Sequence, residues 1–203
     1  MFTPVIEIPA ETPRSIVLEP PLSDDEFERL CEKSDFAFLE RTKEGAIIVN
    51  APAGGSTSSG NAEITRQLSN WWIQSRRGRV FDSSAGFFLP DGSVLSPDAS
   101  YVTAEQLKGL SRDELARFLR VAPAFVVELR SESDRLPAVT EKMEAWMANG
   151  VEVGWLVDPY GREVHIYEAG AAAPRIEKGT HAAGSGPIEG FVLDLQEVWR
   201  CYE

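Results

Sequence analysis

Apolar residues recur at helical spacing in three segments of the chain. The first, residues 23–31, opens with a capping box formed by Ser23 and Glu26. The second covers roughly residues 61–75, and the third runs from residue 139 to an Asn149–Gly150 pair that is typical of a helix end. These segments predict three amphipathic helices. Two more helices are expected, an exposed one over 104–117 and a short one after residue 193.

Short apolar runs between these helices predict β-strands. Two pairs of runs flank polar turns and predict hairpins, at 36–39 with 46–49 and at 151–157 with 164–167. Further short strands are expected between residues 87 and 102 and near 190–193. The run 124–129 (AFVVEL) is almost continuously apolar, which is typical of a strand buried on both faces. Residues 52–60 (PAGGSTSSG) are rich in Gly and Ser and predict a loop.

The order of these elements predicts a mixed α/β fold in which helices flank a central mixed β-sheet and additional β-hairpins are attached. Residues 1–22 contain five prolines and are expected to form an extended N-terminal arm. The length of the segment 23–203 is that of a single domain.

The charge of the chain narrows the classes of function. Its 203 residues include 32 acidic and 20 basic side chains, which gives a net charge of −12. This balance excludes a generally basic protein that coats nucleic acid, although a nuclease can confine its positive charge to one cleft. The basic cluster in the sequence is Arg76, Arg77 and Arg79.

Cysteine and histidine usage favours neither a disulfide framework nor a zinc site. The chain has two cysteines, Cys31 and Cys201, and two histidines, and their spacings match no zinc motif. No apolar run approaches the roughly 18 residues of a membrane-spanning helix, and no secretory signal is visible. We therefore expect a cytoplasmic protein with reduced thiols.

Two carboxylates are candidates for chemistry. Asp98 follows Pro97 at the start of an expected strand, and Glu128 lies inside the apolar run 124–129. An ionised carboxylate in such a run is costly unless it is paired or bound to a metal ion. A structural explanation is an ion pair between Glu128 and Arg130, and a functional one is a metal site. The spacing alone leaves both explanations open.

Four sequence motifs follow one another around these carboxylates. They are SPDASYV at 96–102, FVVELRSESD at 125–134, Lys142 with MEAWMANGV at 143–151, and GWLVDP at 154–159. In this order they resemble the PD-(D/E)XK pattern of restriction-endonuclease-like nucleases, and most closely the Uma-two family of restriction endonucleases. The helix that begins at Asn61 resembles the first core helix of that family. The resemblance extends over roughly residues 22–193, which is most of the chain.

This resemblance implies an endonuclease that hydrolyses phosphodiester bonds of double-stranded DNA with Mg²⁺, or with Mn²⁺ as a substitute. The implied metal ligands are Asp98, Glu128 and the backbone carbonyl of Leu129, with Glu63 as an additional acidic ligand. Two carboxylates suit Mg²⁺, which keeps several waters in its coordination shell. Relatives are often dimeric, so the resemblance also implies a homodimer.

The catalytic cation departs from the superfamily pattern. Arg130 occupies the position of the classical lysine, and Lys142 stands where members of this branch carry a lysine on the following helix. Arginine stays protonated and is a poor proton shuttle, although its planar fork can bind a phosphate. Both residues are therefore candidate catalytic cations.

A second class of function stays open. Arg130 and the acidity of the chain also fit a protein that keeps the nuclease fold but has weak or no catalysis and acts as a binding or regulatory module. A different hydrolase and a purely structural dimer are further alternatives.

Overall fold

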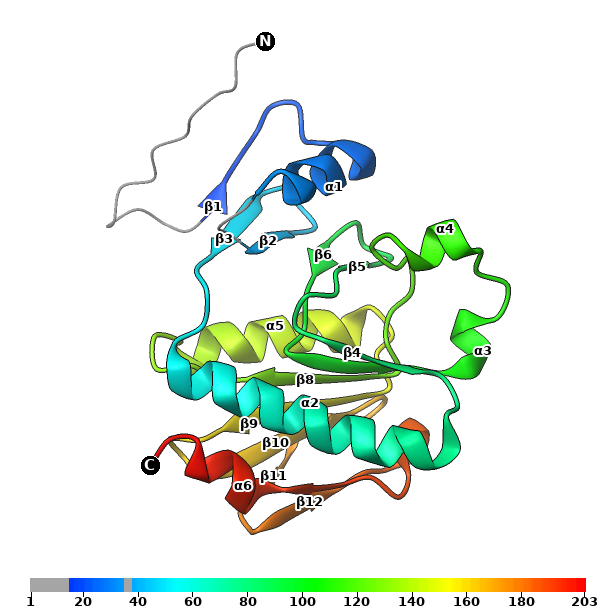
Figure 1. The fold of residues 1–203 in the computed structure, drawn as a ribbon. Coiled ribbons are helices and arrows are strands. Elements are labelled where there is room, and N and C mark those ends of the chain that lie inside the picture. The colour runs from blue at the N-terminus through cyan, green and yellow to red at the C-terminus, as the bar shows by residue number, and fades with distance from the viewer. Residues whose placement is uncertain (1–14, 35–37) are drawn as a thin grey trace.

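The structure is a computed structural model that describes residues 15–34 and 38–203 (Figure 1). Most of the expected arm, residues 1–14, lies outside the described residues, as do residues 35–37 at the start of the first expected hairpin. The described end of the arm contains β1 (Ser15–Ile16), which pairs with β3 (Ile47–Asn50).

A six-stranded mixed sheet lies at the centre of the fold. Its strands follow the order β11-β10-β9-β8-β7-β4. Their bounds are Arg79–Asp82 (β4), Ala99–Val102 (β7), Phe125–Leu129 (β8), Val153–Asp158 (β9), Glu163–Glu168 (β10) and Arg175–Glu177 (β11). β8 and β9 run parallel, and every other neighbouring pair is antiparallel. Helix α5 (Leu136–Ala148) makes the crossover that the parallel pair requires.

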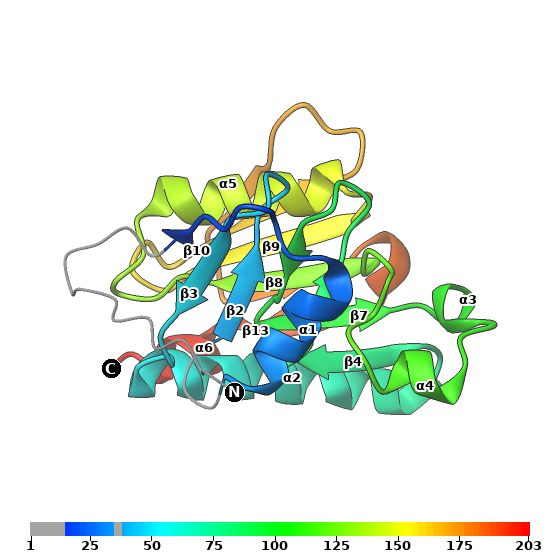
Figure 2. The same cartoon turned by 90° about the horizontal axis from the view of Figure 1, so that it is seen from above.

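Helices cover both faces of this sheet, as Figures 1 and 2 show. α2 (Gly55–Ser75) and α6 (Leu195–Arg200) pack on one face and α5 packs on the other. Along β8, Val127 and Leu129 face the α2 layer, whereas Val126 faces the α5 layer. All five residues of β8 are buried, so the expected strand with two buried faces is confirmed. Glu128, which alternates with these residues, is thereby directed toward α5.

A second sheet is built largely from the N-terminal part of the chain. Its order is β1-β3-β2-β6-β5, with β2 at Phe38–Arg41, β5 at Phe87–Phe88 and β6 at Val94–Leu95. α1 (Asp24–Glu32) contributes Phe27 to the small core beneath it. In Figure 1 β2 and β3 lie above α5 and α2, and in the view from above they project onto the region between these two helices (Figure 2). The hairpin β12 (His181–Ala183) and β13 (Val192–Asp194) flanks the short helix η1 (Gly186–Ile188) and completes the described elements.

α2 begins earlier than the sequence pattern predicts. The expected loop 52–60 is wrong from Gly55 onward, because these residues form the first turns of the helix. Thr57 and Gly60 are buried. A Cβ atom on Gly60 would lie 2.7 Å from Cδ2 of Leu129, so glycine allows the helix to approach β8 closely.

The single exposed helix expected over 104–117 is also wrong. The structure has two helical turns instead, α3 (Ala104–Leu107) and α4 (Arg112–Leu115), each with its own capping box. Gly109 between them has φ +89°, a left-handed conformation that interrupts a helix.

The aromatic residues of α2 pack onto the core. Trp71 and Trp72 are partly buried, and their Nε1 atoms donate hydrogen bonds to the carbonyls of Glu189 (3.3 Å) and Gly78 (2.9 Å). Ile73 remains exposed. This helix therefore offers little apolar surface for association, and the homodimer stays a prediction.

None of the helices formed by the described residues is long and apolar enough to cross a membrane. Cys31 and Cys201 are both free.

Candidate functional site

A cleft of about 1640 Å³ lies where the N-terminal sheet meets one end of the central sheet. Residues of β2, β3, the first turns of α2, the segment before β7, the end of β8 and α5 line it. Its lining includes nine acidic side chains and three basic ones, Lys43, Lys142 and Arg162. The cleft is therefore strongly acidic and suited to a cation.

Glu128 is buried at the inner end of this cleft, with 4% of its surface exposed. Its Oε1 accepts a hydrogen bond from Nε1 of Trp146 (2.8 Å) and pairs with Nζ of Lys142 (3.1 Å). Burial raises the pKa of Glu128 to about 8, although Lys142 opposes the shift. The explanation by an ion pair between Glu128 and Arg130 is wrong, because the cation that pairs with Glu128 is Lys142 of helix α5.

Asp98 lies beside Glu128, immediately before β7, which pairs with β8. Its backbone N–H donates to the carbonyl of Val127 (3.0 Å), which holds it against the end of β8. One carboxylate oxygen accepts from the N–H of Leu129 (2.7 Å), and the other accepts from Nδ2 of Asn61 (2.6 Å). Burial nevertheless raises the pKa of Asp98 above its ordinary value. The two carboxylates are thus held on adjacent strands.

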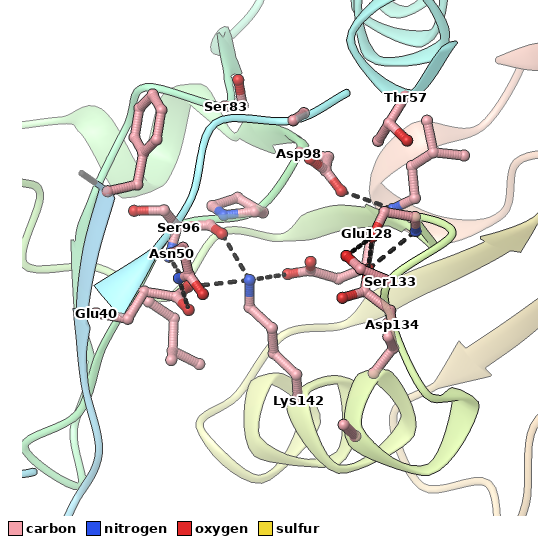
Figure 3. A pocket seen from close by; sticks show the side chains of 18 of the residues that line it. Glu40, Asn50, Thr57, Ser83, Ser96, Asp98, Glu128, Ser133, Asp134 and Lys142 are labelled. Atoms are coloured by element: carbon pink, nitrogen blue, oxygen red, sulfur yellow. Dashed lines mark hydrogen bonds and ion pairs between the residues drawn. The ribbon is translucent and has the colours of Figure 1, made fainter. Parts of the chain in front are cut away.

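Lys142 reaches from α5 into the space between two carboxylates (Figure 3). Its ammonium donates to the carbonyl of Ser96 (2.8 Å) and pairs with Glu40 (2.9 Å) and Glu128 (3.1 Å). Burial acts to lower the pKa of Lys142, but attraction to Glu128 and Glu40 outweighs it, so that the pKa is raised. The side chain is 24% exposed, and its charge is held in place at the cleft.

Glu40 is a component of the site that the sequence did not reveal. It lies on β2, and only 5% of its surface is exposed. Its Oε1 also accepts from the N–H of Ser96 (2.9 Å), and its Oε2 accepts from Nδ2 of Asn50 (3.0 Å). No local pattern pointed to Glu40, because its partners in the cleft come from distant parts of the chain.

The structure does not bring Arg130 into this group. Its guanidinium pairs with Asp158 (2.9 Å) and lies over the ring of Tyr160, with 5.3 Å from Cζ to the ring centroid. These contacts use Arg130 to brace the turn after β9. We therefore do not place it among the catalytic residues.

Glu63 is also outside the group. Although Glu63 and Asn61 share α2, the Glu63 carboxylate accepts hydrogen bonds from Arg66 (2.5 and 2.8 Å) and Gln67 (2.8 Å). It lines a separate shallow pocket near α6. The helical rotation between residues 61 and 63 points their side chains in different directions.

The residues at the cleft fit one divalent cation. Asp98, Glu128, Glu40 and Lys142 together carry a charge of −2 when all are ionised. Oδ1 of Asn61, next to Asp98, is buried and lacks a hydrogen-bond partner among the described residues. Within residues 15–34 and 38–203, no three His, Cys, Asp or Glu side chains are grouped closely enough to hold a metal ion. Two carboxylates, a backbone oxygen and water form a ligand set that Mg²⁺ accepts.

Comparison with solved structures supports the fold. A crystal structure from Anabaena variabilis, described as a "putative nuclease belonging to DUF820", superposes with a TM-score of 0.75 and 22% sequence identity. The match covers 90% of this chain and 100% of that one. A DrdV–DNA complex gives a TM-score of 0.38 at 15% identity, covering 70% of this chain and 10% of that one. A TM-score of 0.38 is too low to show a shared fold, so only the structure from Anabaena variabilis shows the fold of this chain.

Comparison at the level of sequence supports the family. A search among proteins of curated function finds no match. The family model Uma2, described as "Putative restriction endonuclease", matches residues 24–196. This range contains Asp98, Glu128, Lys142 and Glu40 and covers most of the chain. The chain therefore belongs to the Uma2 family of restriction-endonuclease-like proteins.

Proposed function

We propose that the protein is a divalent-metal-dependent endonuclease that hydrolyses phosphodiester bonds of double-stranded DNA. One observation carries the proposal: Asp98 and Glu128, on adjacent strands, and Lys142, from the crossover helix, line the same cleft. Two carboxylates beside a held ammonium are the groups that metal-assisted phosphodiester hydrolysis requires. Family membership supports the same reaction class.

Asp98 and Glu128 would hold Mg²⁺ or Mn²⁺ together with the backbone carbonyl of Leu129. A bound ion of this kind lowers the pKa of a coordinated water and neutralises charge that develops on the phosphate. Asn61 and the Leu129 N–H fix the orientation of Asp98, while Trp146 and Lys142 fix that of Glu128. Both carboxylates are thus oriented before an ion arrives, which limits the entropic cost of binding.

Lys142 would orient the attacking water or a phosphate oxygen through its ammonium hydrogens. It stays charged because Glu40 and Glu128 raise its pKa, so it acts as an electrostatic donor rather than as a general base. Arg130 takes no part in this step, because Asp158 and Tyr160 hold its guanidinium elsewhere.

A plasmid-cleavage assay tests the proposal. Supercoiled DNA is incubated with wild type in Mg²⁺, in Mn²⁺ and in EDTA, and nicked and linear products are quantified. We expect cleavage with either ion and none in EDTA, and Glu128→Gln should abolish it. Glu63→Gln, on the far side of α2, should retain it. A fully active Glu128→Gln variant, or cleavage in EDTA, contradicts the proposal.

A second candidate is a binding or regulatory module that keeps the nuclease fold but has weak or no catalysis. It is favoured by Arg130, which stands in the classical lysine position but braces a turn. Calorimetric titration with Mn²⁺ separates the two candidates when combined with the plasmid assay. A stoichiometric metal site that Glu128→Gln abolishes, without any DNA cleavage by wild type, favours the module.

A further inference from the structure

We propose that Glu40 is a positioning residue that holds Lys142 and the segment leading to Asp98 in their working arrangement. The inference rests on the proposed endonuclease function and adds to it a residue from the N-terminal sheet, outside the motifs of the central sheet. It starts from the burial of Glu40, whose side chain is only 7% exposed although it carries a charge.

The contacts of Glu40 form a closed ring with two other groups. Its Oε1 accepts from the Ser96 N–H (2.9 Å) and pairs with Lys142 (2.9 Å), while Lys142 donates to the Ser96 carbonyl (2.8 Å). The ring joins β2, the segment before β7 and α5. Ser96 lies two residues before Asp98, so the ring holds both the ammonium and the backbone that leads to the first carboxylate (Figure 3).

The hydrogen-bonding capacity of Lys142 explains why a second carboxylate is needed. An ammonium has three donors, and the three oxygens around it come from Ser96, Glu40 and Glu128. Glu128 is the proposed metal ligand, so the hydrogen that points to it is the one available to water or phosphate. Glu40 and Ser96 retain Lys142 through the other two hydrogens.

Glu40 is itself held rigidly, as a positioning residue must be. Nδ2 of Asn50, on the neighbouring strand β3, donates to its second oxygen at 3.0 Å. Arg41, the next residue on β2, points to the opposite side and is tied to Asp24 (2.5 Å) and to the carbonyl of Gly92 (2.8 Å). These contacts anchor β2 on both sides and hold the Glu40 carboxylate against Lys142.

The test compares Glu40→Gln with a matched variant, Glu28→Gln. Glu28 is equally buried (5%), pairs with Arg117 and accepts a backbone N–H from Phe118 (3.0 Å), but it lies outside the cleft. Both substitutions remove one buried charge at nearly constant volume. Only Glu40→Gln should lower kcat in Mg²⁺, by ~10–100-fold, the range seen when groups that orient a metal site are changed. KM for DNA should change little in either variant.

A second readout uses metal-free protein. The chain has five lysines, so the ammonium signal of Lys142 in ¹⁵N-lysine NMR spectra can be assigned with a Lys142→Arg variant. In wild type its hydrogens should exchange slowly with water because three acceptors hold them. Exchange should become faster in Glu40→Gln and stay unchanged in Glu28→Gln. Should Glu40→Gln fail to fold, Asn50→Ala keeps the charge but releases one contact of Glu40, and a smaller change in the same direction is expected.

The outcomes separate this inference from the proposed function. An active wild type with an equally active, folded Glu40→Gln variant overturns the positioning role alone. An unchanged Lys142 signal in Glu40→Gln overturns it as well. An inactive wild type overturns the proposed function, and the role of Glu40 in the reaction is then overturned with it.

Discussion

At the scale of single residues, the Glu128 carboxyl group connects burial with metal binding. Burial raises its pKa to about 8, so without metal this carboxyl group takes up a proton at a higher pH than an ordinary glutamate does. Because a metal ion competes with that proton, affinity should rise with pH from about 5 to 8 and level off above that range. Calorimetric titration with Mn²⁺ across this range checks the prediction. A flat affinity would contradict it, and in Glu128→Gln the pH dependence should disappear with the site.

The same reasoning predicts the effect of Asp98→Asn on stability. In EDTA the variant should be more stable than wild type, because it lacks one of the clustered negative charges. The new amide can also donate a hydrogen bond to Oδ1 of Asn61, which has no partner among the described residues, once the Asn61 amide group rotates. The gain should be on the order of 0.5–2 kcal/mol, as when a functional compromise is relieved. In excess Mg²⁺ the stability difference between the variant and wild type should shrink or change sign. The reason is that wild type is stabilised by bound metal, by about 2.7 kcal/mol at a hundredfold excess over Kd. Four melting curves suffice, and equal metal shifts for both proteins would exclude Asp98 as a ligand.

Replacing Lys142 should affect catalysis, whereas replacing Arg130 should affect the stability of the fold. Lys142→Met should lower kcat by roughly 10²–10⁴-fold, the range for a positioned catalytic group. Arg130→Ala should instead destabilise the fold, on the order of 1–3 kcal/mol, since the buried Asp158 is left without its partner. Steady-state cleavage and urea unfolding of both variants measure these effects. A fully active Lys142→Met together with a folded but inactive Arg130→Ala would reverse the two assignments.

At the scale of elements, the packing of α2 on β8 controls the geometry of the site. Gly60→Ala would place a Cβ atom 2.7 Å from Leu129, so we expect a loss of about 1–3 kcal/mol from overpacking. Gly55→Ala, in the same helix, meets nothing within 4 Å and should be neutral or slightly stabilising. Urea unfolding of both variants tests the difference. Equal stabilities would show that the helix can move away from the strand freely.

At the scale of the whole molecule, the acidic cleft and the basic cluster lie at opposite ends of α2. The first turns of the helix line the cleft, whereas Arg76 follows its last turn and Arg77 and Arg79 are exposed beyond it. Twenty-one residues at about 1.5 Å each separate the ends by roughly 30 Å. A DNA duplex that occupied the cleft and ran along α2 would reach these arginines after about one helical turn of DNA.

This arrangement predicts how salt affects DNA binding. The double variant Arg77→Gln/Arg79→Gln should reduce the slope of log K against log salt concentration by up to about 1.8, or about 0.9 for each phosphate that an arginine no longer neutralises. Arg112→Gln, an exposed arginine on α4, is the control and should leave the slope unchanged. Fluorescence anisotropy in Ca²⁺ or EDTA measures binding without cleavage. An unchanged slope in the double variant would place the DNA elsewhere.

The sequence by itself determined where the buried central strands and the middle parts of the long helices lie. The continuous apolar run at 124–129 was sufficient to predict β8, and helical periodicity was sufficient to predict the middle of α2 and most of α5. Both patterns reflect burial along a single element. The resemblance pointed to Asp98, Glu128 and Lys142, which the structure brings to one cleft.

Only the tertiary structure decided which partner each charge has. Glu40 and Lys142 are neighbours because β2 and α5 line the same cleft, and no spacing along the chain encodes that contact. Likewise, Arg130 pairs with Asp158 rather than with Glu128, and Gly60 belongs to a helix rather than a loop, because strand and helix packing outweigh local preference. Local patterns report burial, whereas the partner of a buried charge depends on elements that fold against it from elsewhere in the chain.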